Sequence, residues 1–331
     1  MSPQRFNVLV SSAGRRHALL DLFRRALRAL GLEGDVMAVD ATPLSAAFQS
    51  ADRAFVVPRT SHPEFVPAVL ELCRRHDVRL VVPTIDPELP LYAEHRDAFA
   101  RVGATVAVSS PEVIAIANDK GLTHRWLAAR GFPVPRQATA AEVLGGAPGW
   151  TFPLFAKPVN GSGSIGATVV RDAGELAVLA RNGPLVVETI APGVEHTIDF
   201  LADRSGRARC AVPRRRLEVR AGEVSKGVTV RSPVLEDLAT RLCAALPGAY
   251  GALCVQTFLD DATGALNVTE LNPRFGGGFP LACEAGAHFP RWIVEELLGL
   301  PSTATANGWR DRLVMLRYDA AVFVDGATAG L

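Results

Sequence analysis

The chain of 331 residues carries a formal net charge of +1, with 48% hydrophobic and 21% charged residues. This balance is typical of a soluble globular protein, and the length is enough for two or three lobes around a shared cleft. A net charge so close to zero provides no bulk attraction to nucleic acid or to an anionic membrane. We therefore expect small-molecule partners.

Neither a targeting segment nor a cysteine motif is evident in the sequence. Residues 1–10 lead straight into a strand-like segment, without the charged and apolar regions of a signal peptide. No apolar run reaches the roughly 18 residues that a membrane span needs. The five cysteines are scattered and never spaced as CxxC, which argues against a disulfide framework or a zinc site. We expect a cytoplasmic protein with reduced, buried cysteines.

Short β-branched runs alternate with helix-length segments through residues 1–110, which predicts a Rossmann-like α/β lobe with a parallel sheet. Ligands of such sheets bind beyond the carboxyl ends of the strands, where Arg15, Asp86 and Glu88 are expected to lie. We expect Arg15 to contact substrate and the two acids to hold a substrate ammonium. The alternative for the acids is a helix N-terminus stabilised by its dipole. The predicted strands are 7–12, 36–40, 54–58, 80–83 and 105–109.

A dinucleotide site at this edge is not favoured. The first turn, residues 11–17, reads SSAGRRH and lacks the GxGxxG spacing that lets a backbone approach a pyrophosphate. Asp40 ends the second predicted strand, as a ribose-binding acid would. Without the glycines, this acid alone does not indicate NAD.

Mixed helices and strands follow the first lobe, which predicts an α+β arrangement for the rest of the chain. We divide it into a small lobe with a glycine loop, residues 111–185, and a C-terminal lobe with a metal site, residues 186–331. Residues 312–326 predict one or two further strands in the C-terminal lobe.

Residues 155–166, FAKPVNGSGSIG, place Lys157 at the end of a strand and a glycine-rich loop directly after it. Glycines allow positive φ and let backbone N–H groups converge on phosphate oxygens, while the lysine adds a point charge. The loop is not a Walker A motif, because no GK[ST] ends it. A flexible hairpin turn is the structural alternative.

Lysine is rare in this chain, and the lysines are Lys120, Lys157 and Lys226 only. In a sequence rich in arginine, a lysine is expected where a compact, flexible ammonium is needed that the planar guanidinium cannot replace. Chance retention at the surface is the alternative, and it weighs most for Lys226.

Residues 185–199, LVVETIAPGVEHTID, predict two extended runs around a bend at Pro192–Gly193. The backbone of residues 188–191 can form a connector that contacts an adenine edge, and Glu195 can accept hydrogen bonds from ribose hydroxyls. Taken alone, the segment also fits a hairpin with exposed acids.

Residues 255–278 carry the most specific pattern, ending in ELNPRFGGG. Glu270 and Asn272 are two apart on one strand and share a face, which Gln256 on the preceding strand can join. One carboxylate and two amide oxygens suit Mg²⁺ shared with triphosphate oxygens. Arg274 can hold a phosphate or a carboxylate bidentately. An Asn-Pro turn is the structural alternative.

A cationic stretch runs from residue 214 to residue 231. Alternation along a strand places Arg214 and Arg216 on one face. We expect Arg216 and Lys226 to bind the substrate carboxylate or the γ-phosphate, with Arg214 also at the substrate. The alternative is a solvated strand.

The order of these motifs resembles the ATP-grasp superfamily: Lys120, then KPxxGSGSxG, then ExxxxGxE, then Gln…ExNPR. It is similar to the carbamoyl-phosphate-synthase-like carboxylate–amine ligases, a group that includes the pyrrolysine-pathway ligase. The resemblance covers nearly the whole chain. A full carbamoyl phosphate synthetase carries two such halves and this chain has one, so that activity is not expected.

The resemblance implies an ATP site built from several segments. Lys120 and Lys157 would bind the α- and β-phosphates under a flexible loop. The loop residues are Gly161, Ser162, Gly163, Ser164 and Gly166. The residues at the adenine hinge are Glu188, Thr189 and Ala191, and Glu195 would hold the ribose.

The resemblance also implies a metal and an activity. Gln256, Glu270 and Asn272 would coordinate Mg²⁺, for which Mn²⁺ can substitute, and Arg274 would stabilise the transferred phosphoryl group. We expect an ADP-forming carboxylate–amine ligase that proceeds through an acyl phosphate on an amino acid or similar small acid, and that forms homodimers. The alternatives are an ATP-grasp carboxylase, a ligase with a hydroxyl or thiol acceptor, and a non-catalytic nucleotide-binding regulator.

Overall fold

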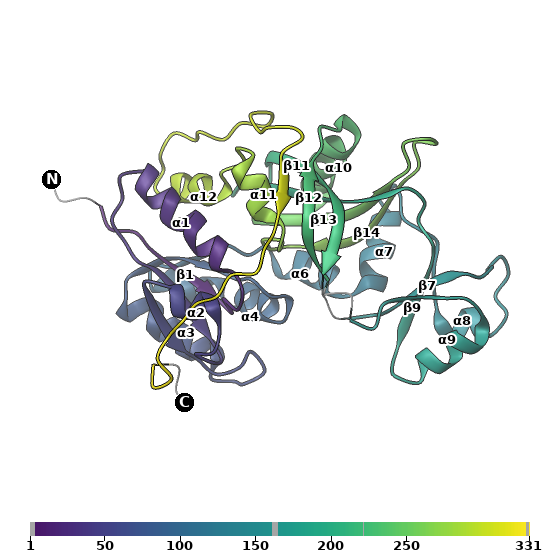
Figure 1. Ribbon diagram of the computed structural model, residues 1–331, viewed down its shortest axis with the longest axis horizontal. Helices are drawn as coiled ribbons and strands as arrows, with labels where there is room; N and C mark the ends of the chain where they lie inside the picture. Colours follow the sequence, from purple (N-terminus) through teal and green to yellow (C-terminus); the bar gives the residue numbers. More distant parts are fainter. Residues whose placement is uncertain (1–3, 161–164, 221, 329–330) are drawn as a thin grey trace.

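The computed structural model describes residues 4–160, 165–220, 222–328 and 331. Three β-sheets organise these residues. The five-stranded sheet of the N-terminal lobe lies at one end of the molecule and the four-stranded sheet of the small lobe at the other, with the six-stranded sheet of the C-terminal lobe between them (Figure 1). A parallel sheet followed by antiparallel sheets confirms the predicted fold class.

The N-terminal sheet has the strand order β3-β2-β1-β4-β5, and all of its strands are parallel. Its central strands are mostly apolar and buried because helices cover both faces. The strands are β1 (Asn7–Ser11), β2 (Val36–Asp40), β3 (Arg53–Val56), β4 (Val78–Val82) and β5 (Thr105–Val106). The helices are α1 (His17–Ala29), α2 (Ala46–Ser50), α3 (Phe65–Arg75), η1 (Asp86–Glu88), α4 (Leu89–Glu94) and α5 (Arg96–Arg101).

The small lobe is an antiparallel sheet with the order β6-β9-β7-β8. Two helices precede it, and the side chain of Asp119 caps the second by accepting a hydrogen bond from the Leu122 N–H. Because β9 pairs within this sheet, the boundary that we expected at residue 186 falls inside a strand, and we propose a boundary after Thr189. The elements are α6 (Pro111–Asn118), α7 (Lys120–Ala128), β6 (Gln137–Thr139), α8 (Ala140–Leu144), β7 (Leu154–Pro158), β8 (Thr168–Val170), α9 (Ala173–Ala180) and β9 (Leu185–Thr189).

The C-terminal lobe is an antiparallel sheet with the order β14-β13-β10-β11-β12-β15. Its last strand is the only one within residues 312–326, and the chain then runs on across the N-terminal lobe (Figure 1). The strands are β10 (Val194–Ala202), β11 (Ala208–Arg220), β12 (Glu223–Thr229), β13 (Gly251–Leu259), β14 (Leu266–Asn272) and β15 (Val314–Leu316). The helices are α10 (Pro233–Ala245), α11 (Phe279–Glu284) and α12 (Phe289–Leu297).

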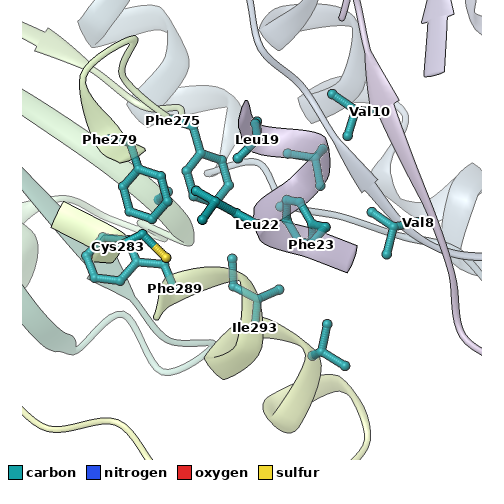
Figure 2. Close-up of a cluster of buried hydrophobic side chains, with 14 of the residues drawn as sticks. Val8, Val10, Leu19, Leu22, Phe23, Phe275, Phe279, Cys283, Phe289 and Ile293 are labelled. Atoms are coloured by element: carbon teal, nitrogen blue, oxygen red, sulfur yellow. The ribbon is translucent and has the colours of Figure 1, made fainter. Parts of the chain in front are cut away.

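One hydrophobic core joins the N-terminal lobe to the C-terminal lobe. Figure 2 shows side chains of β1 and α1 meeting those of α11, α12 and the loop before α11. The rings of Phe23 and Phe275 meet edge to face at 6.0 Å, and the rings of Phe275 and Phe279 at 4.7 Å. Edge-to-face pairs stabilise beyond the apolar area they bury. This core therefore fixes the turn before α1 relative to the loop before α11.

The cysteines are all free and buried, as their spacing led us to expect. Burial raises the pKa of the Cys73, Cys210 and Cys283 thiols to about 12, which keeps these thiols protonated. Over the part of the chain that the structure describes, no helix is both long and apolar enough to cross a membrane.

A buried ion pair links β10 to β11. Arg214 Nε lies 2.5 Å from Asp199 Oδ2, and Arg214 Nη2 lies 3.1 Å from Asp199 Oδ1. Each side chain is only 2% exposed. Burial raises the pKa of the Asp199 carboxyl, and the Arg214 charge opposes that rise. The next residue, Arg215, points the other way and is exposed.

We predict that Arg214→Ala destabilises the protein strongly and Arg215→Ala does not. The first substitution leaves Asp199 buried without its partner, which costs about 3–5 kcal/mol of unfolding free energy. The second removes an exposed side chain from the same strand and costs about 0.5 kcal/mol or less. Urea unfolding monitored by circular dichroism gives both values. Equal losses for the two variants would contradict the structural role of the pair.

Candidate active site

The first cavity lies between the four-stranded and six-stranded sheets and has a volume of about 380 Å³. One part of its wall is apolar, with Phe155 from β7 and Phe258 from β13 facing across it. The other part carries the charged side chains of Lys120, Lys157 and Glu270. A cavity with an apolar section and a cationic section suits a ligand with a flat ring at one end and phosphates at the other.

Lys157 is held in place at the cationic end of the first cavity. Its Nζ lies 2.8 Å from a Glu188 carboxylate oxygen and donates to the carbonyl of Thr269 at 3.1 Å. Gln137 Nε2 donates to the other Glu188 oxygen at 2.8 Å. The side chains of Lys157 and Glu188 are 7% and 5% exposed. Glu188, which we expected at the adenine hinge, thus positions the lysine.

Lys120 brings a second ammonium to the same end of the cavity. It is the first residue of α7, and its backbone N–H donates to the carbonyl of Val159 at 3.1 Å, which ties the start of the helix to the end of β7. Burial lowers the pKa of the Lys120 ammonium, Glu270 raises it, and the nearby Lys157 lowers it. Two ammonium groups that repel each other in a partly buried site are stabilised by a polyanion between them.

The expected adenine hinge lines the first cavity. Thr189 and Ala191 are both part of its wall, with Ile190 between them. The hinge is fixed to the preceding segment, because Thr189 N–H donates to the Arg136 carbonyl at 3.0 Å and Thr189 Oγ1 accepts from the Arg136 N–H at 3.1 Å. Thr189 therefore serves as a hydrogen-bonding brace for the hinge.

Glu195, expected at the ribose, also lines the first cavity and makes an ion pair with Arg216. Arg216 Nη1 further approaches Gln256 Oε1 at 3.5 Å, and Nη2 donates to the Gly222 carbonyl at 3.3 Å. The arginine thus links three segments at the cavity wall. Among the basic residues that the structure describes in the cationic stretch, residues 214–231, Arg216 alone lines both cavities.

Most of the expected glycine loop, Gly161, Ser162, Gly163 and Ser164, lies outside the described residues. Its last glycine, Gly166, adopts φ +73, a backbone conformation that favours glycine. On either side of it, Ile165 and Ala167 line the first cavity.

The second cavity, about 200 Å³, lies between the N-terminal and C-terminal lobes. Its lining is more polar than that of the first cavity and rich in arginine. Arg216, Gln256 and Glu270 line both cavities, so the two share one wall. The residues that line it and carry charge are Arg16, Asp86, Arg214, Arg216, Glu223, Glu270 and Arg274.

The expected metal ligands lie at and beside the shared wall, since Gln256 and Glu270 line both cavities and Asn272 lines the second. Gln256 on β13 is the register partner of Glu270 on β14, and Asn272 follows two residues on. Burial raises the pKa of the Glu270 carboxyl, while the charges of Lys120 and Lys157 lower it. The described residues hold no group of three or more His, Cys, Asp or Glu side chains that could bind a metal alone. One carboxylate with two amide oxygens fits Mg²⁺ that shares its remaining positions with phosphate oxygens.

Arg274 and Asp86, which we expected to act separately, form a pair. Arg274 Nε and Nη2 lie 2.7 and 2.8 Å from the two Asp86 oxygens, and Nη2 lies 3.3 Å from Asn272 Oδ1. Burial lowers the pKa of the Arg274 guanidinium, but the contacts with Asp86 raise that pKa by more, so the net shift is upward. The Asp86 carboxylate orients Arg274. Because both of its oxygens contact the guanidinium, Asp86 is poorly placed to hold a substrate ammonium.

Glu88, which we expected to hold a substrate ammonium, is not placed to do so. It is fully buried and lines neither cavity. Its carboxylate accepts hydrogen bonds from the Ser11 and Ser12 hydroxyls at 2.6 and 2.7 Å and from the Thr84 N–H at 2.6 Å. Glu88 braces the ends of β1 and β4, as a structural acid does, instead of binding substrate.

The remaining substrate candidates separate into one cavity residue and two surface residues. Arg214 lines the second cavity but is committed to its buried pair. The Arg15 side chain is 74% exposed and outside both cavities. The Lys226 side chain is 50% exposed, lies 2.6 Å from Glu218, and is also outside both cavities.

Arg16 and Glu223 line the second cavity, and sequence reasoning missed both. The adjacent arginines Arg15 and Arg16 mark this position in the sequence, but we predicted a substrate contact for Arg15 only. The direction of each side chain depends on how the turn enters α1, which the residue types do not specify. Glu223 is the first residue of β12 and belongs to none of the sequence motifs.

We predict that Lys157→Met weakens ATP binding, whereas Lys226→Met leaves it unchanged. The first variant removes a charged hydrogen-bond donor from the first cavity, a loss of roughly ten- to a hundredfold in affinity. The second removes an exposed lysine outside both cavities. Isothermal calorimetry with ATP and Mg²⁺ measures both, and the melting temperature of each variant checks its folding. Equal affinity in a folded Lys157→Met protein would exclude this lysine from the site.

Two family models match the chain. One, described as the PylC-like, N-terminal domain, matches residues 8–107, and the other, described as ATP-grasp in the biosynthetic pathway with Ter operon, matches residues 181–318.

Among curated proteins, the chain is 36% identical over 121 residues to D-alanine--D-alanine ligase of Aromatoleum aromaticum, covering 33% of this chain and 36% of that relative. It is 26% identical over 302 residues to the carbamoyl phosphate synthase large chain of Mycobacterium bovis, covering 78% of this chain and 25% of that relative. The chain thus spans well under two thirds of the length of either relative.

Among solved structures, the fold superposes with a TM-score of 0.72 on the biotin carboxylase domain of 2-oxoglutarate carboxylase from Hydrogenobacter thermophilus, in complex with MgADP, ADP and bicarbonate. The sequences are 18% identical, and the match covers 93% of this chain and 73% of that one. The two family models thus identify a PylC-like N-terminal domain followed by an ATP-grasp domain in this chain, and the shared fold agrees with that order.

Proposed function

We propose that the protein is an ADP-forming carboxylate–amine ligase that activates an amino acid or similar small acid as an acyl phosphate. The observation that carries this proposal is the wall of Arg216, Gln256 and Glu270 between the two cavities. ATP in the first cavity and an acid in the second would meet at that wall. Holding the two reactants in contact supplies much of the rate of such a step.

In this proposal the chain binds ATP along the first cavity. The adenine lies at the Thr189–Ala191 hinge, the ribose meets Glu195, and the α- and β-phosphates bind Lys120 and Lys157. Gln256, Glu270 and Asn272 would hold Mg²⁺, which when bound offsets negative charge on the phosphates. The buried Lys157–Glu188 pair keeps its ammonium oriented before ATP arrives.

The first step is phosphoryl transfer. A carboxylate oxygen of the acid forms a bond to the γ-phosphorus as the bond from that phosphorus to the β–γ bridging oxygen breaks, and ADP leaves. Arg274, oriented by Asp86 and Asn272, donates to the transferring phosphoryl oxygens. The nitrogen of the acceptor amine then attacks the acyl carbon. The bond between that carbon and the oxygen that bridges it to phosphorus breaks, and inorganic phosphate departs with the carboxylate oxygen that attacked phosphorus and takes up the proton that the amine releases.

Two observations support this reaction over its rivals. The second cavity has a volume of about 200 Å³, which leaves room for an acid larger than the bicarbonate held by the superposed biotin carboxylase domain. We therefore propose a larger acid as the activated substrate. Oriented donors at the shared wall likewise favour turnover over a purely regulatory role. The acceptor class, amine against hydroxyl or thiol, and homodimer formation are left to experiment.

We predict that ADP is released from ATP and Mg²⁺ only when an acid and an amine are supplied together. Pools of amino acids and other small acids, tested singly and in pairs with a coupled ADP assay, identify the partners. Glu270→Ala lowers this release on the order of a hundredfold, because the carboxylate at the shared wall is lost. Glu218→Ala, an exposed glutamate outside both cavities, serves as the matched control and keeps wild-type activity.

The other outcomes each decide against part of the proposal. Release that requires bicarbonate with one further substrate would indicate a carboxylase. Release with hydroxyl or thiol acceptors but not amines would change the acceptor class. ATP binding without release in any pool would support the regulatory alternative.

A further inference from the structure

The arginines of the second cavity differ in how their charges are paired. Arg214 contacts Asp199, Arg216 contacts Glu195, and Arg274 contacts Asp86, each through hydrogen bonds. Arg16 is the exception. Its nearest carboxylate is that of Glu223, 3.7 Å from Nη1, and the described residues offer its side chain no hydrogen bond.

Glu223 is itself shared among three guanidinium groups. Arg317 Nη1 donates to it at 2.9 Å, Arg15 Nη2 lies at 3.6 Å and Arg16 Nη1 at 3.7 Å. Arg317 holds the shortest of these contacts. A carboxylate already hydrogen-bonded to Arg317 neutralises Arg16 only in part, so this end of the second cavity carries excess positive charge.

Arg16 is also largely removed from water. Its side chain is 18% exposed, compared with 74% for Arg15 beside it. Burial lowers the pKa of the Arg16 guanidinium, Glu223 raises it, and the Arg274 charge lowers it further. A buried cation without a hydrogen-bonded partner is unfavourable, and a carboxylate with bidentate geometry is the ligand that best relieves it.

The surroundings hold Arg16 against the cavity and leave room beside it. A Cβ at Gly277 would lie 3.1 Å from Arg16 Nη1 and 2.9 Å from the Glu223 carboxyl, so the loop backbone passes close to both charged groups. Arg16 immediately precedes α1, and the Phe23–Phe275 contact fixes that helix against the same loop. The guanidinium is thus presented at the end of the cavity that the N-terminal lobe forms.

We propose that Arg16 binds a carboxylate of the substrate that is not the one activated by ATP. This inference rests on the proposed ligase function and specifies its substrate class. Either the acceptor is an amino acid whose own carboxylate binds Arg16, or the activated acid carries a second carboxylate. In both cases the reacting end of the molecule faces Glu270 and Arg274, and the remote carboxylate lies on the N-terminal lobe.

The test compares Arg16→Ala with Arg15→Ala and Arg16→Lys, using the substrate pair found by the ADP assay. Arg16→Ala raises the KM of one substrate by roughly ten- to a hundredfold, while the KM of ATP changes less than about twofold. Arg15→Ala leaves all KM values unchanged. Arg16→Lys restores part of the affinity, because the charge returns without the bidentate fork. The substrate whose KM rises is the source of the carboxylate.

A second readout uses analogues in which the remote carboxylate is a primary amide. The wild-type enzyme discriminates against the amide, and Arg16→Ala does not. Equal use of acid and amide by the wild type, or equal KM values in Arg16→Ala and Arg15→Ala, would overturn the proposal while leaving the ligase function intact.

Failure of the ligase function is detected separately. If no pool yields ADP, calorimetric titration of succinate and glutamate into the wild-type protein and the two alanine variants still tests the site. Binding by the wild type and Arg15→Ala but not by a folded Arg16→Ala supports the carboxylate site. No binding by the wild type, or equal binding by all three, overturns it.

Discussion

The candidate site depends on how α1 of the N-terminal lobe packs against α11 and α12 of the C-terminal lobe. The contacts among Phe23, Phe275 and Phe279 fix this arrangement. Each of the helices α1 and α11 directly follows a loop of the second cavity, and the aromatic core therefore sets the distance between those loops. If the lobes could slide, the ion pair of Asp86 with Arg274 would break, and the second cavity would lose one of its walls.

The fold and much of the lining of the first cavity could be predicted because their signals are local. Alternating apolar runs indicate parallel strands wherever they occur, and the end of one strand fixes where Lys157 emerges. Two-residue spacing places Glu270 and Asn272 on one face whatever surrounds them. The hinge at Thr189 and Ala191 lines the first cavity because it lies in the short connector from β9 of the four-stranded sheet to β10 of the six-stranded sheet.

The charge pairing in the second cavity could not be predicted, because it depends on which charged residues meet across the fold. Asp86 and Arg274 are 188 residues apart, and neither residue indicates that the other neutralises it. Glu88 is an acid in the same short segment as Asp86, and the sequence does not distinguish them. In the fold, however, the Glu88 carboxylate accepts hydrogen bonds from the end of β1 and the loop after β4, which gives it a structural role. Arg15 and Arg16 are identical residues in tandem, and only the entry of the chain into α1 sends one to solvent and the other into the cavity.

The central claim is that an acid in the second cavity attacks the γ-phosphate of ATP in the first. The most direct measurement uses the acid labelled with ¹⁸O in its carboxylate and follows the label by mass spectrometry of the inorganic phosphate. Attack through an acyl phosphate transfers one labelled oxygen to phosphorus, so the released phosphate carries ¹⁸O in proportion to product formed. Product formed with unlabelled phosphate would show that the carboxylate is never phosphorylated and would contradict the account.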